Sequence, residues 1–226
     1  MLLLTPVPVP VRVTVLARVL VLALPLTLVL PAPGLAAAGD SGEAPRPGSR
    51  VDWSAIVAAN GNRAPDDLEG RLYLAVAYAN QGRVPEAARE FRAIEAAGYS
   101  EFGREVIARA EQVLDREPGD IISLNLVAFA YYAFSNYRKS AECFERLVAL
   151  DPRNIWTRHY FALSLSRIEQ LDRAIEVLKA ALALDPSNEY THLLLGLAYK
   201  EKGWYILSVL ELARAGRAVR ELSTLK

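Results

Sequence analysis

The chain has 226 residues, and 52% of them are hydrophobic, which excludes a wholly disordered protein. Lysine and arginine balance aspartate and glutamate at 26 each, so the electrostatic footprint of a nucleic-acid-binding protein is missing and no nucleic-acid partner is predicted. The single cysteine, Cys143, excludes an intramolecular disulfide and a cysteine-based zinc site. Its apolar-periodic surroundings favour a buried thiol over a reactive one.

The first 38 residues have the pattern of a targeting segment. The run from Val19 to Ala38 carries no charge, Arg12 and Arg18 lie just upstream, and an Ala-x-Ala pattern closes it. This order is typical of a secretory signal peptide, with cleavage after Ala38. We predict that residues 1–38 are removed and that the protein is exported, to an extracytoplasmic or secreted location.

A retained membrane anchor is the alternative for the same segment, because its 20 uncharged residues are enough to cross about 30 Å of hydrocarbon. The run is broken by Pro25, Pro31 and Pro33, which favours a cleaved signal. Membrane contact is therefore expected only through an uncleaved N-terminal segment. Residues 39–50 are rich in glycine, proline, serine and charge, and predict a flexible linker before a folded region at 51–226.

An internal repeat organises the second half of the chain. Prolines recur every 34 residues, at Pro118, Pro152 and Pro186. Two places after each proline stands a residue that can cap the next helix: Asp120, Asn154 and Asn188. Apolar residues between these marks follow a helical period, and each block is broken near its middle, at 135–136, at 169–170 and at Gly203. The pattern predicts an all-α protein of antiparallel helix pairs.

The residues within each block resemble the tetratricopeptide repeat, whose first helix carries a large, a small and an aromatic residue and whose second carries a small and a large apolar residue before a proline. In 121–154 the matching residues are Val127, Ala128, Tyr131, Ser140, Phe144, Leu147 and Pro152. In 155–188 they are Phe161, Ala162, Leu165, Ala174, Leu178, Ala181 and Pro186. In 189–222 they are Leu195, Gly196, Tyr199, Gly203, Ser208, Leu212 and Ala215. The resemblance implies a solenoid of stacked helix pairs.

A fourth copy lies upstream, near 68–101, and an extra helical segment at 102–117 separates it from the other three. The count of helices is therefore odd. Either the extra helix stands alone, or it pairs with the preceding helix from Pro85 to Ala97 and the helix beginning at Leu68 pairs with the segment from Val51 to Asn60. The sequence leaves both arrangements open, and a continuous inner face is expected only from residue 121 onward.

Catalytic chemistry is not indicated. The chain has no glycine-rich phosphate loop, nucleophile turn or metal-spaced histidine pair, and its two histidines, His159 and His192, fall in successive first helices. We expect His159 to be a solvent-exposed groove residue and His192 to be packed in the core. No enzyme activity, cofactor or metal site is predicted.

The family binds peptides or helices in a concave groove formed by exposed positions of the first helices. The resemblance places ten residues there, with Trp156 at the rim: Asn125, Phe129, Tyr132, Trp156, His159, Leu163, Arg167, Tyr190, Leu193 and Leu197. This implies an exported scaffold or adaptor that binds a protein partner, unidentified by the sequence, in an aromatic groove. One alternative is that another part of this chain, such as 51–66, covers the groove. Another is a structural subunit of an envelope assembly, packed permanently against its neighbours.

Overall fold

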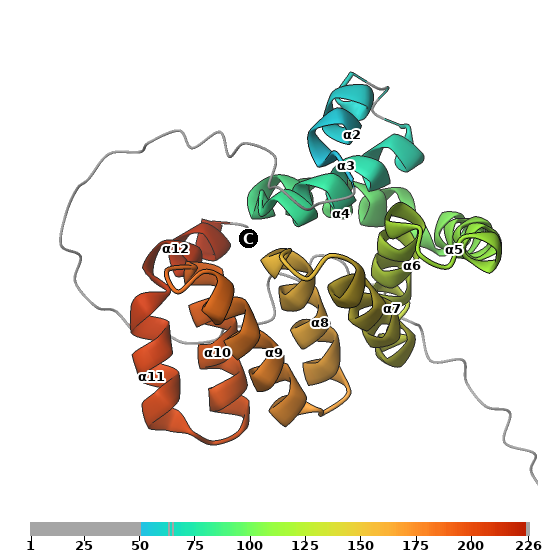
Figure 1. The fold of residues 1–226 in the computed structure, drawn as a ribbon. Coiled ribbons are helices and arrows are strands. Elements are labelled where there is room, and N and C mark those ends of the chain that lie inside the picture. The colour runs from blue at the N-terminus through green and yellow to red at the C-terminus, as the bar shows by residue number, and fades with distance from the viewer. Residues whose placement is uncertain (1–50, 63, 65, 225–226) are drawn as a thin grey trace, which may run out of the picture.

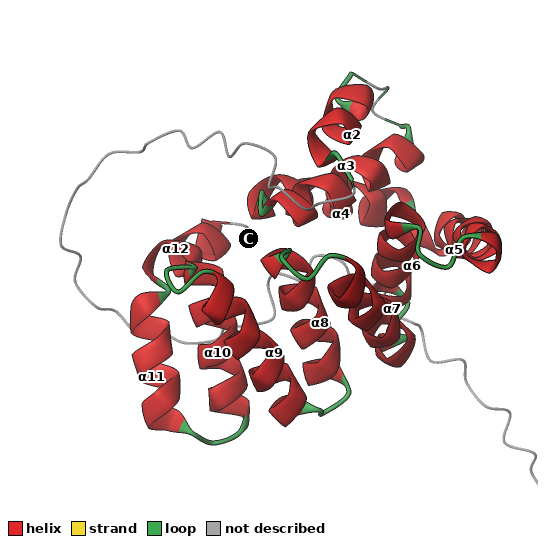
Figure 2. Cartoon of the chain, in the orientation of Figure 1, coloured by secondary structure: helices red, strands yellow, loops and turns green. Residues whose placement is uncertain are grey.

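The structure is a computed structural model that describes residues 51–62, 64 and 66–224, and the predicted signal peptide and linker lie outside the described residues. In the described part, eleven α-helices and no strands are joined by short loops (Figure 2). The predicted all-α solenoid of antiparallel helix pairs is confirmed. The helices of the N-terminal part are α2 (Trp53–Asn60), α3 (Leu68–Gln81), α4 (Val84–Ala97) and α5 (Tyr99–Arg116). Those that follow are α6 (Ile121–Ala133), α7 (Tyr137–Leu150), α8 (Ile155–Arg167), α9 (Leu171–Leu184), α10 (Glu189–Glu201), α11 (Tyr205–Arg214) and α12 (Gly216–Thr224).

The repeated polar residues start the first helices as their spacing predicted. The Asp120 carboxylate accepts a hydrogen bond from the Ser123 amide at 2.7 Å, which caps α6. Asn154 and Asn188 cap α8 and α10 in the same way, each with an acceptor 3.0 Å from an amide of the first turn. The predicted mid-block breaks coincide with left-handed backbone, at φ 59° for Ser135, 61° for Glu169 and 77° for Gly203. These turns reverse the chain between the two helices of each pair.

The C-terminal part is a regular stack. The helices pair as α6 with α7, α8 with α9 and α10 with α11, and α7 and α9 also pack against the first helix of the next pair. The helices of this stack share a continuous core. Its large apolar side chains are almost fully buried: Phe144, Leu147, Leu165, Leu178 and Leu195. Each second helix inside the stack is thus covered on two sides.

The N-terminal part departs from this regular stack. Helix α3 packs along α4, with α2 against it, whereas α5 packs against α6 and barely touches α4. Helix α3 also contacts both α6 and α8. Figure 1 shows α3 and α4 running across the direction of α8 and α10 rather than parallel to them. The extra helix α5 begins at Tyr99, three residues before its predicted start.

The C-terminal end also differs from expectation. The second helix of the last pair, α11, ends at Arg214, and a separate helix, α12, begins at Gly216. Helix α12 packs against α10, where the Ala218 amide donates a 3.0 Å hydrogen bond to the Glu189 carboxylate. Among the described residues, no helix combines the length and apolarity needed to cross a membrane.

Candidate functional site

The ten residues assigned to the groove lie on the three first helices α6, α8 and α10, but most of them are not exposed. Arg167 is exposed and Leu163 and Leu197 are half-buried. The other seven are buried: Asn125, Phe129, Tyr132, Trp156, His159, Tyr190 and Leu193. The expectation that His159 faces solvent is wrong, since only 3% of its surface is exposed. An open aromatic groove along all three first helices does not exist in this structure.

Helix α3 lies over the α6 and α8 part of the groove face, and a buried asparagine network holds it there. The Asn80 side chain of α3 donates a hydrogen bond to the Asn125 side-chain oxygen of α6 at 2.9 Å. Its own side-chain oxygen accepts from Asn154, the N-cap of α8, at 2.9 Å. Buried amides of this kind are costly unless paired, so the network specifies where α3 sits. The predicted alternative of self-coverage therefore applies, but through α3 rather than through residues 51–66.

Trp156 lies directly beneath the turn that follows α3. Gly82 ends α3 with φ 76°, and a Cβ atom built on it would lie 2.1 Å from two carbons of the Trp156 indole. Only glycine fits a contact this close with a positive φ. The indole ring also meets the rings of His159 and Tyr190 edge to face, at centroid distances of 5.0 and 5.4 Å. Trp156 therefore contacts both the α3–α4 turn and the groove residues His159 and Tyr190.

The remaining aromatic groove residues pack against the protein itself. The Phe129 ring lies 5.2 Å from Phe91 of α4 and 4.8 Å from Tyr160 of α8, measured between ring centroids. Tyr132 meets Tyr137 edge to face at 5.0 Å. Phe129 is therefore part of the core that joins the N-terminal helices to the repeat stack, whereas Tyr132 packs within the α6–α7 pair.

Neither histidine is placed for catalysis. The Nε2 atom of His159 is 2.7 Å from the Thr191 hydroxyl, and burial lowers the pKa of its ring to about 3, so it is neutral at physiological pH. His192 is buried, as its register predicted, and its Nδ1 is 2.6 Å from the Glu211 carboxylate. Its Nε2 is 3.0 Å from the Pro186 carbonyl oxygen. His192 thus ties α10 to α11.

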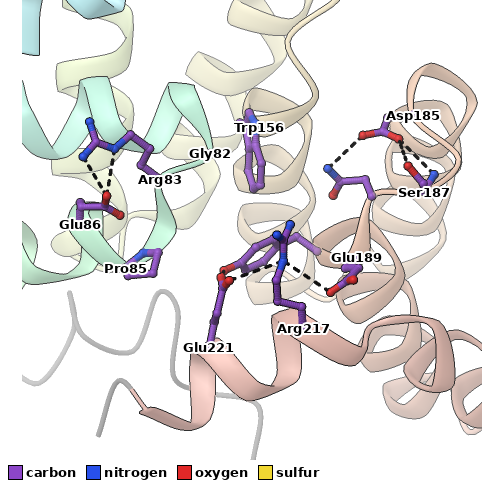
Figure 3. Close-up of a pocket in the computed structure, with 12 residues that line it drawn as sticks. Gly82, Arg83, Pro85, Glu86, Trp156, Asp185, Ser187, Glu189, Arg217 and Glu221 are labelled. Atoms are coloured by element: carbon purple, nitrogen blue, oxygen red, sulfur yellow. Dashed lines mark hydrogen bonds and ion pairs between the residues drawn. The ribbon is translucent and has the colours of Figure 1, made fainter. Parts of the chain in front are cut away.

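A cleft remains open between the two ends of the chain. Its volume is about 420 Å³, and it lies between the α3–α4 turn on one side and the start of α10 with α12 on the other (Figure 3). Two predicted groove residues, Trp156 and Tyr190, belong to its lining. The other lining residues are Gly82, Arg83, Pro85, Glu86, Asp185, Ser187, Asn188, Glu189, Arg217 and Glu221. We take this cleft as the candidate functional site.

The walls of the cleft are charged and internally paired. Arg83 forms a 2.8 Å ion pair with Glu86 on the α3–α4 side. On the opposite side Arg217 lies 3.6 Å from Glu221 and 4.0 Å from Glu189. The Tyr190 hydroxyl donates a hydrogen bond to Glu221, and burial, followed by this hydrogen bond, raises the pKa of the tyrosine. Two arginines face four acids, so the cleft is acidic overall: Arg83 and Arg217 against Glu86, Asp185, Glu189 and Glu221.

Nothing in the sequence indicates that the charged residues of the cleft lie together. Arg83 and Arg217 are 134 positions apart and neither belongs to a repeat motif, so only the packing of α3 and α12 brings them to one site. Among the described residues, no group of three or more histidine, cysteine, aspartate or glutamate side chains is placed to hold a metal ion. The chemistry that the cleft offers is hydrogen bonding, ion pairing and aromatic contact.

Two family models match the chain. One, described as TPR repeat, covers residues 164–203, from the last turn of α8 through α10. The other, described as tetratricopeptide repeat, covers residues 52–101, which include α2, α3 and α4. The chain is a tetratricopeptide repeat protein. Such families are generally interaction scaffolds rather than enzymes, and repeats of this type indicate protein partners.

Among curated relatives, the chain is similar to the lipopolysaccharide assembly protein B of Escherichia coli strain K12 and of Escherichia coli O157:H7. It is 28% identical to each over 179 residues, covering 69% of this tetratricopeptide chain but only 46% of the relative.

Two solved structures have the same fold. The MamA fragment 41-end from Desulfovibrio magneticus RS-1 gives a TM-score of 0.53 at 19% identity, over 74% of this chain and 93% of that one. The MamA RS-1 ArsTM double mutant gives a TM-score of 0.52 at 17% identity, over 74% and 94%. At these identities the likeness concerns the fold alone.

Proposed function

We propose that this tetratricopeptide repeat protein is an exported adaptor that binds an extended segment of another envelope protein in the cleft between the α3–α4 turn and α10. The observation that carries the proposal is the cleft itself, where Trp156 and Tyr190 of the predicted groove border an open volume of about 420 Å³. Ligand pockets in proteins span roughly 300–1,000 Å³, so this cleft suits a few residues of peptide. The name of the relatives, lipopolysaccharide assembly protein B, supports an envelope setting.

The charges of the cleft favour a peptide with basic or amide-rich side chains. Glu86 and Glu189 stand on opposite walls and accept hydrogen bonds, while Arg83 and Arg217 donate them. A peptide backbone offers both donors and acceptors, and the acidic excess favours a lysine or arginine side chain on the ligand. Trp156 and Tyr190 lie between the walls, and since only 8% and 9% of their surfaces are exposed, they contribute the edges of their rings to the cleft. This chemistry differs from the apolar groove that the sequence suggested.

Site-specific photo-cross-linking in the native cell tests the cleft. A photo-reactive amino acid at Arg83 or at Arg217 should capture the same partner from the two walls, since both residues line the cleft. Glu105 is the matched control, because it is exposed on α5 and does not line the cleft. Capture of one protein by both cleft positions and not by Glu105 supports the proposal. No cross-linked protein at either cleft position, or the same pattern at all three, contradicts it.

Export is the second part of the proposal and has its own test. A signal peptide cleaved after Ala38 leaves a mature protein that begins at Gly39. N-terminal sequencing of the protein purified from its natural host should therefore start at Gly39. A retained segment from residue 19 to 38 would instead identify a membrane anchor, and recovery of the uncleaved chain from the cytosol would refute export.

A structural subunit of an envelope assembly is the second candidate function. One specific observation favours it, which is the run of large apolar side chains exposed along α11.

A further inference from the structure

Helix α11 carries an apolar surface that nothing in the described chain covers. Of the eight large hydrophobic residues that are exposed in the described part, six belong to α11 or to its N-cap. We call them the α11 patch, with these exposed fractions: Trp204 45%, Tyr205 68%, Ile206 81%, Leu207 43%, Val209 66% and Leu210 52%. Figure 1 shows α11 at the outer edge of the helix row, beyond α10. Its opposite side is packed, with Ser208 buried against the rest of the fold.

The apolar surface of α11 is wider than that of the second helices α7 and α9 at the equivalent repeat positions. A second helix inside the stack needs apolar residues only where it meets its two neighbours. Three patch positions correspond to charged residues in both earlier second helices, one and two repeats upstream. The sets are Ile206 with Asp172 and Arg138, Leu207 with Arg173 and Lys139, and Leu210 with Glu176 and Glu142. Those earlier residues are exposed, whereas the last copy has replaced every one of them by an apolar side chain.

The end of a solenoid normally has a polar outer face, because terminal repeats must be soluble. In this chain the element that follows α11 does not provide one. Helix α12 turns back onto α10, where Ala215 and Ala218 are fully buried. Among the described helices, none covers the outer side of α11, which is therefore an apolar surface at this end of the stack.

We propose that the α11 patch is the contact surface of a two-fold symmetric dimer of this chain. From the exposed fractions, the six side chains present on the order of 600 Å² to solvent, at the upper end of what monomeric proteins expose in one patch. Complete burial of both patches would remove on the order of 1,200 Å², an upper bound that reaches the range of standard protein interfaces. The patch contains no charged side chain, so it can face its own copy without bringing like charges together at its centre.

Charge at the helix ends selects the antiparallel arrangement. Arg214 stands at the C-terminal end of α11 and Tyr205 at the N-terminal end. In an antiparallel pair Arg214 of one copy faces the Tyr205 ring of the other, which allows cation–π contacts, whereas a parallel pair sets two Arg214 side chains together. A lipid surface is less favoured, because the arginines of α11 and α12 are nearly balanced by acids: Arg214, Arg217 and Arg220 against Glu211 and Glu221.

Cysteine cross-linking of the full chain in cells tests the dimer directly. Val209 lies at the middle of α11 and meets the middle of its symmetry mate, so Val209→Cys should yield a product of twice the chain mass with a short bis-maleimide. The only native thiol, Cys143, is buried, and burial raises its pKa to about 11, so the wild type measures the background. Glu176→Cys is the matched control, because Glu176 is exposed at the position of α9 that corresponds to Leu210. We expect about tenfold more dimer from Val209→Cys than from Glu176→Cys.

A charge-restoring variant provides the second arm. Ile206→Asp, Leu207→Arg and Leu210→Glu together give α11 the residues that α9 carries at the same positions, which the fold already tolerates there. The full chain should then sediment as a monomer with an unchanged helical spectrum, while the wild type sediments as a dimer. Because the patch lies outside the cleft, partner capture from Arg83 should persist, so the two proposals fail independently.

Three outcomes overturn the dimer. The first is a Val209→Cys chain that stays monomeric or cross-links only to other proteins. The second is a triple variant that remains dimeric. The third is protection of the Val209→Cys thiol by vesicles of anionic and neutral lipid without any dimer product, which identifies the patch as a membrane-contacting surface instead.

Discussion

At the scale of single residues, the contact between Gly82 and Trp156 decides how the molecule closes. The turn at Gly82 has φ 76°, and its missing Cβ leaves room for the indole ring. Gly203 has nearly the same backbone, φ 77°, at the end of α10, but a Cβ there would meet no atom within 4 Å. Substituting each glycine by alanine therefore separates two costs. At Gly203 the cost is the strain of a positive φ alone, and at Gly82 a clash with the indole ring is added.

This pair gives the first prediction. Gly203→Ala should lower the free energy of unfolding by about 1 kcal/mol, because an alanine with positive φ is strained. Gly82→Ala should lower it by about 2–4 kcal/mol, since the same strain is joined by a clash with the Trp156 ring. Urea unfolding of the two variants and the wild type measures the difference. Equal losses of unfolding free energy in the two variants would show that the turn after α3 does not contact Trp156 of α8.

His159 gives a prediction about pH. The unfolded ring has its ordinary pKa near 6.5, and burial lowers the folded pKa to about 3. Between these values the unfolded chain takes up a proton that the folded chain does not, so stability is fully present above pH 6.5 and is lost as the pH falls. From pH 7 to 5.5 the loss due to this one group is about 1 kcal/mol.

Comparison with His159→Gln isolates that contribution. Glutamine has no charge at either pH and can still bond with Thr191, so this variant should lose about 1 kcal/mol less than the wild type over the same interval. Urea midpoints at pH 7 and 5.5 give both losses, and His192, present in both proteins, cancels. Parallel losses would mean that His159 becomes charged in the folded protein.

At the scale of elements, the position of α3 is set by the extra helix α5. Because α5 packs against α6, it takes the place that a preceding second helix would occupy in a regular stack. The α3–α4 pair cannot continue the row and instead lies across α6 and α8, where Asn80 is held by Asn125 and Asn154. The position of α3 over α6 and α8 follows from this irregularity, and it sets one wall of the cleft.

Removing the Asn80 side chain should destabilise the packing of α3 and α4 on the repeat stack without unfolding the stack itself. Asn80→Ala leaves the buried amides of Asn125 and Asn154 each short of a partner, at a cost of about 2–4 kcal/mol in total. Hydrogen exchange should then speed up in α3 and α4 more than in α9. Gln81→Ala is the control, because the Gln81 side chain donates to the exposed Ser54 hydroxyl and its loss should change exchange little. Uniform acceleration in all helices would indicate that α3 and the stack unfold as one unit.

At the scale of the whole molecule, the protein is one helical array with an irregular start and an apolar end. The core runs without a break from Trp53 of α2 to Ala218 of α12. The second helix α7, which carries Cys143, is enclosed between α6 and α8. Access to this thiol therefore reports on opening of the array.

Cys143 labelling tests this enclosure. Burial raises the pKa of the thiol from 9.0 to about 11, which by itself reduces the thiolate fraction near neutral pH about a hundredfold. Maleimide should therefore label the native protein at least about a hundredfold more slowly than the urea-unfolded protein at the same pH. Fast labelling of the native chain would show that α7 opens independently of its neighbours.

The local structure could be predicted from the sequence because it depends on short-range chemistry. The caps at Asp120, Asn154 and Asn188, the breaks at 135–136 and 169–170, and the pairing of helices within 34 residues all arise from neighbours along the chain. The burial of Cys143 was predicted from the apolar periodicity, and that of His192 from its position in the repeat.

What the tertiary structure decided is which of these surfaces remain open. A repeat pattern assigns Asn125, His159 and Tyr190 to one face of the first helices, but it cannot state that α3 lies on that face, because the contact joins residues 45 to 74 positions apart. The charged cleft and the uncovered α11 patch have the same origin. The cleft depends on where α3 and α12 lie, the α11 patch depends on where α12 lies, and packing against distant helices determines both positions. Short-range sequence patterns are therefore enough to predict a tetratricopeptide array, whereas long-range packing determines which faces of that array stay exposed.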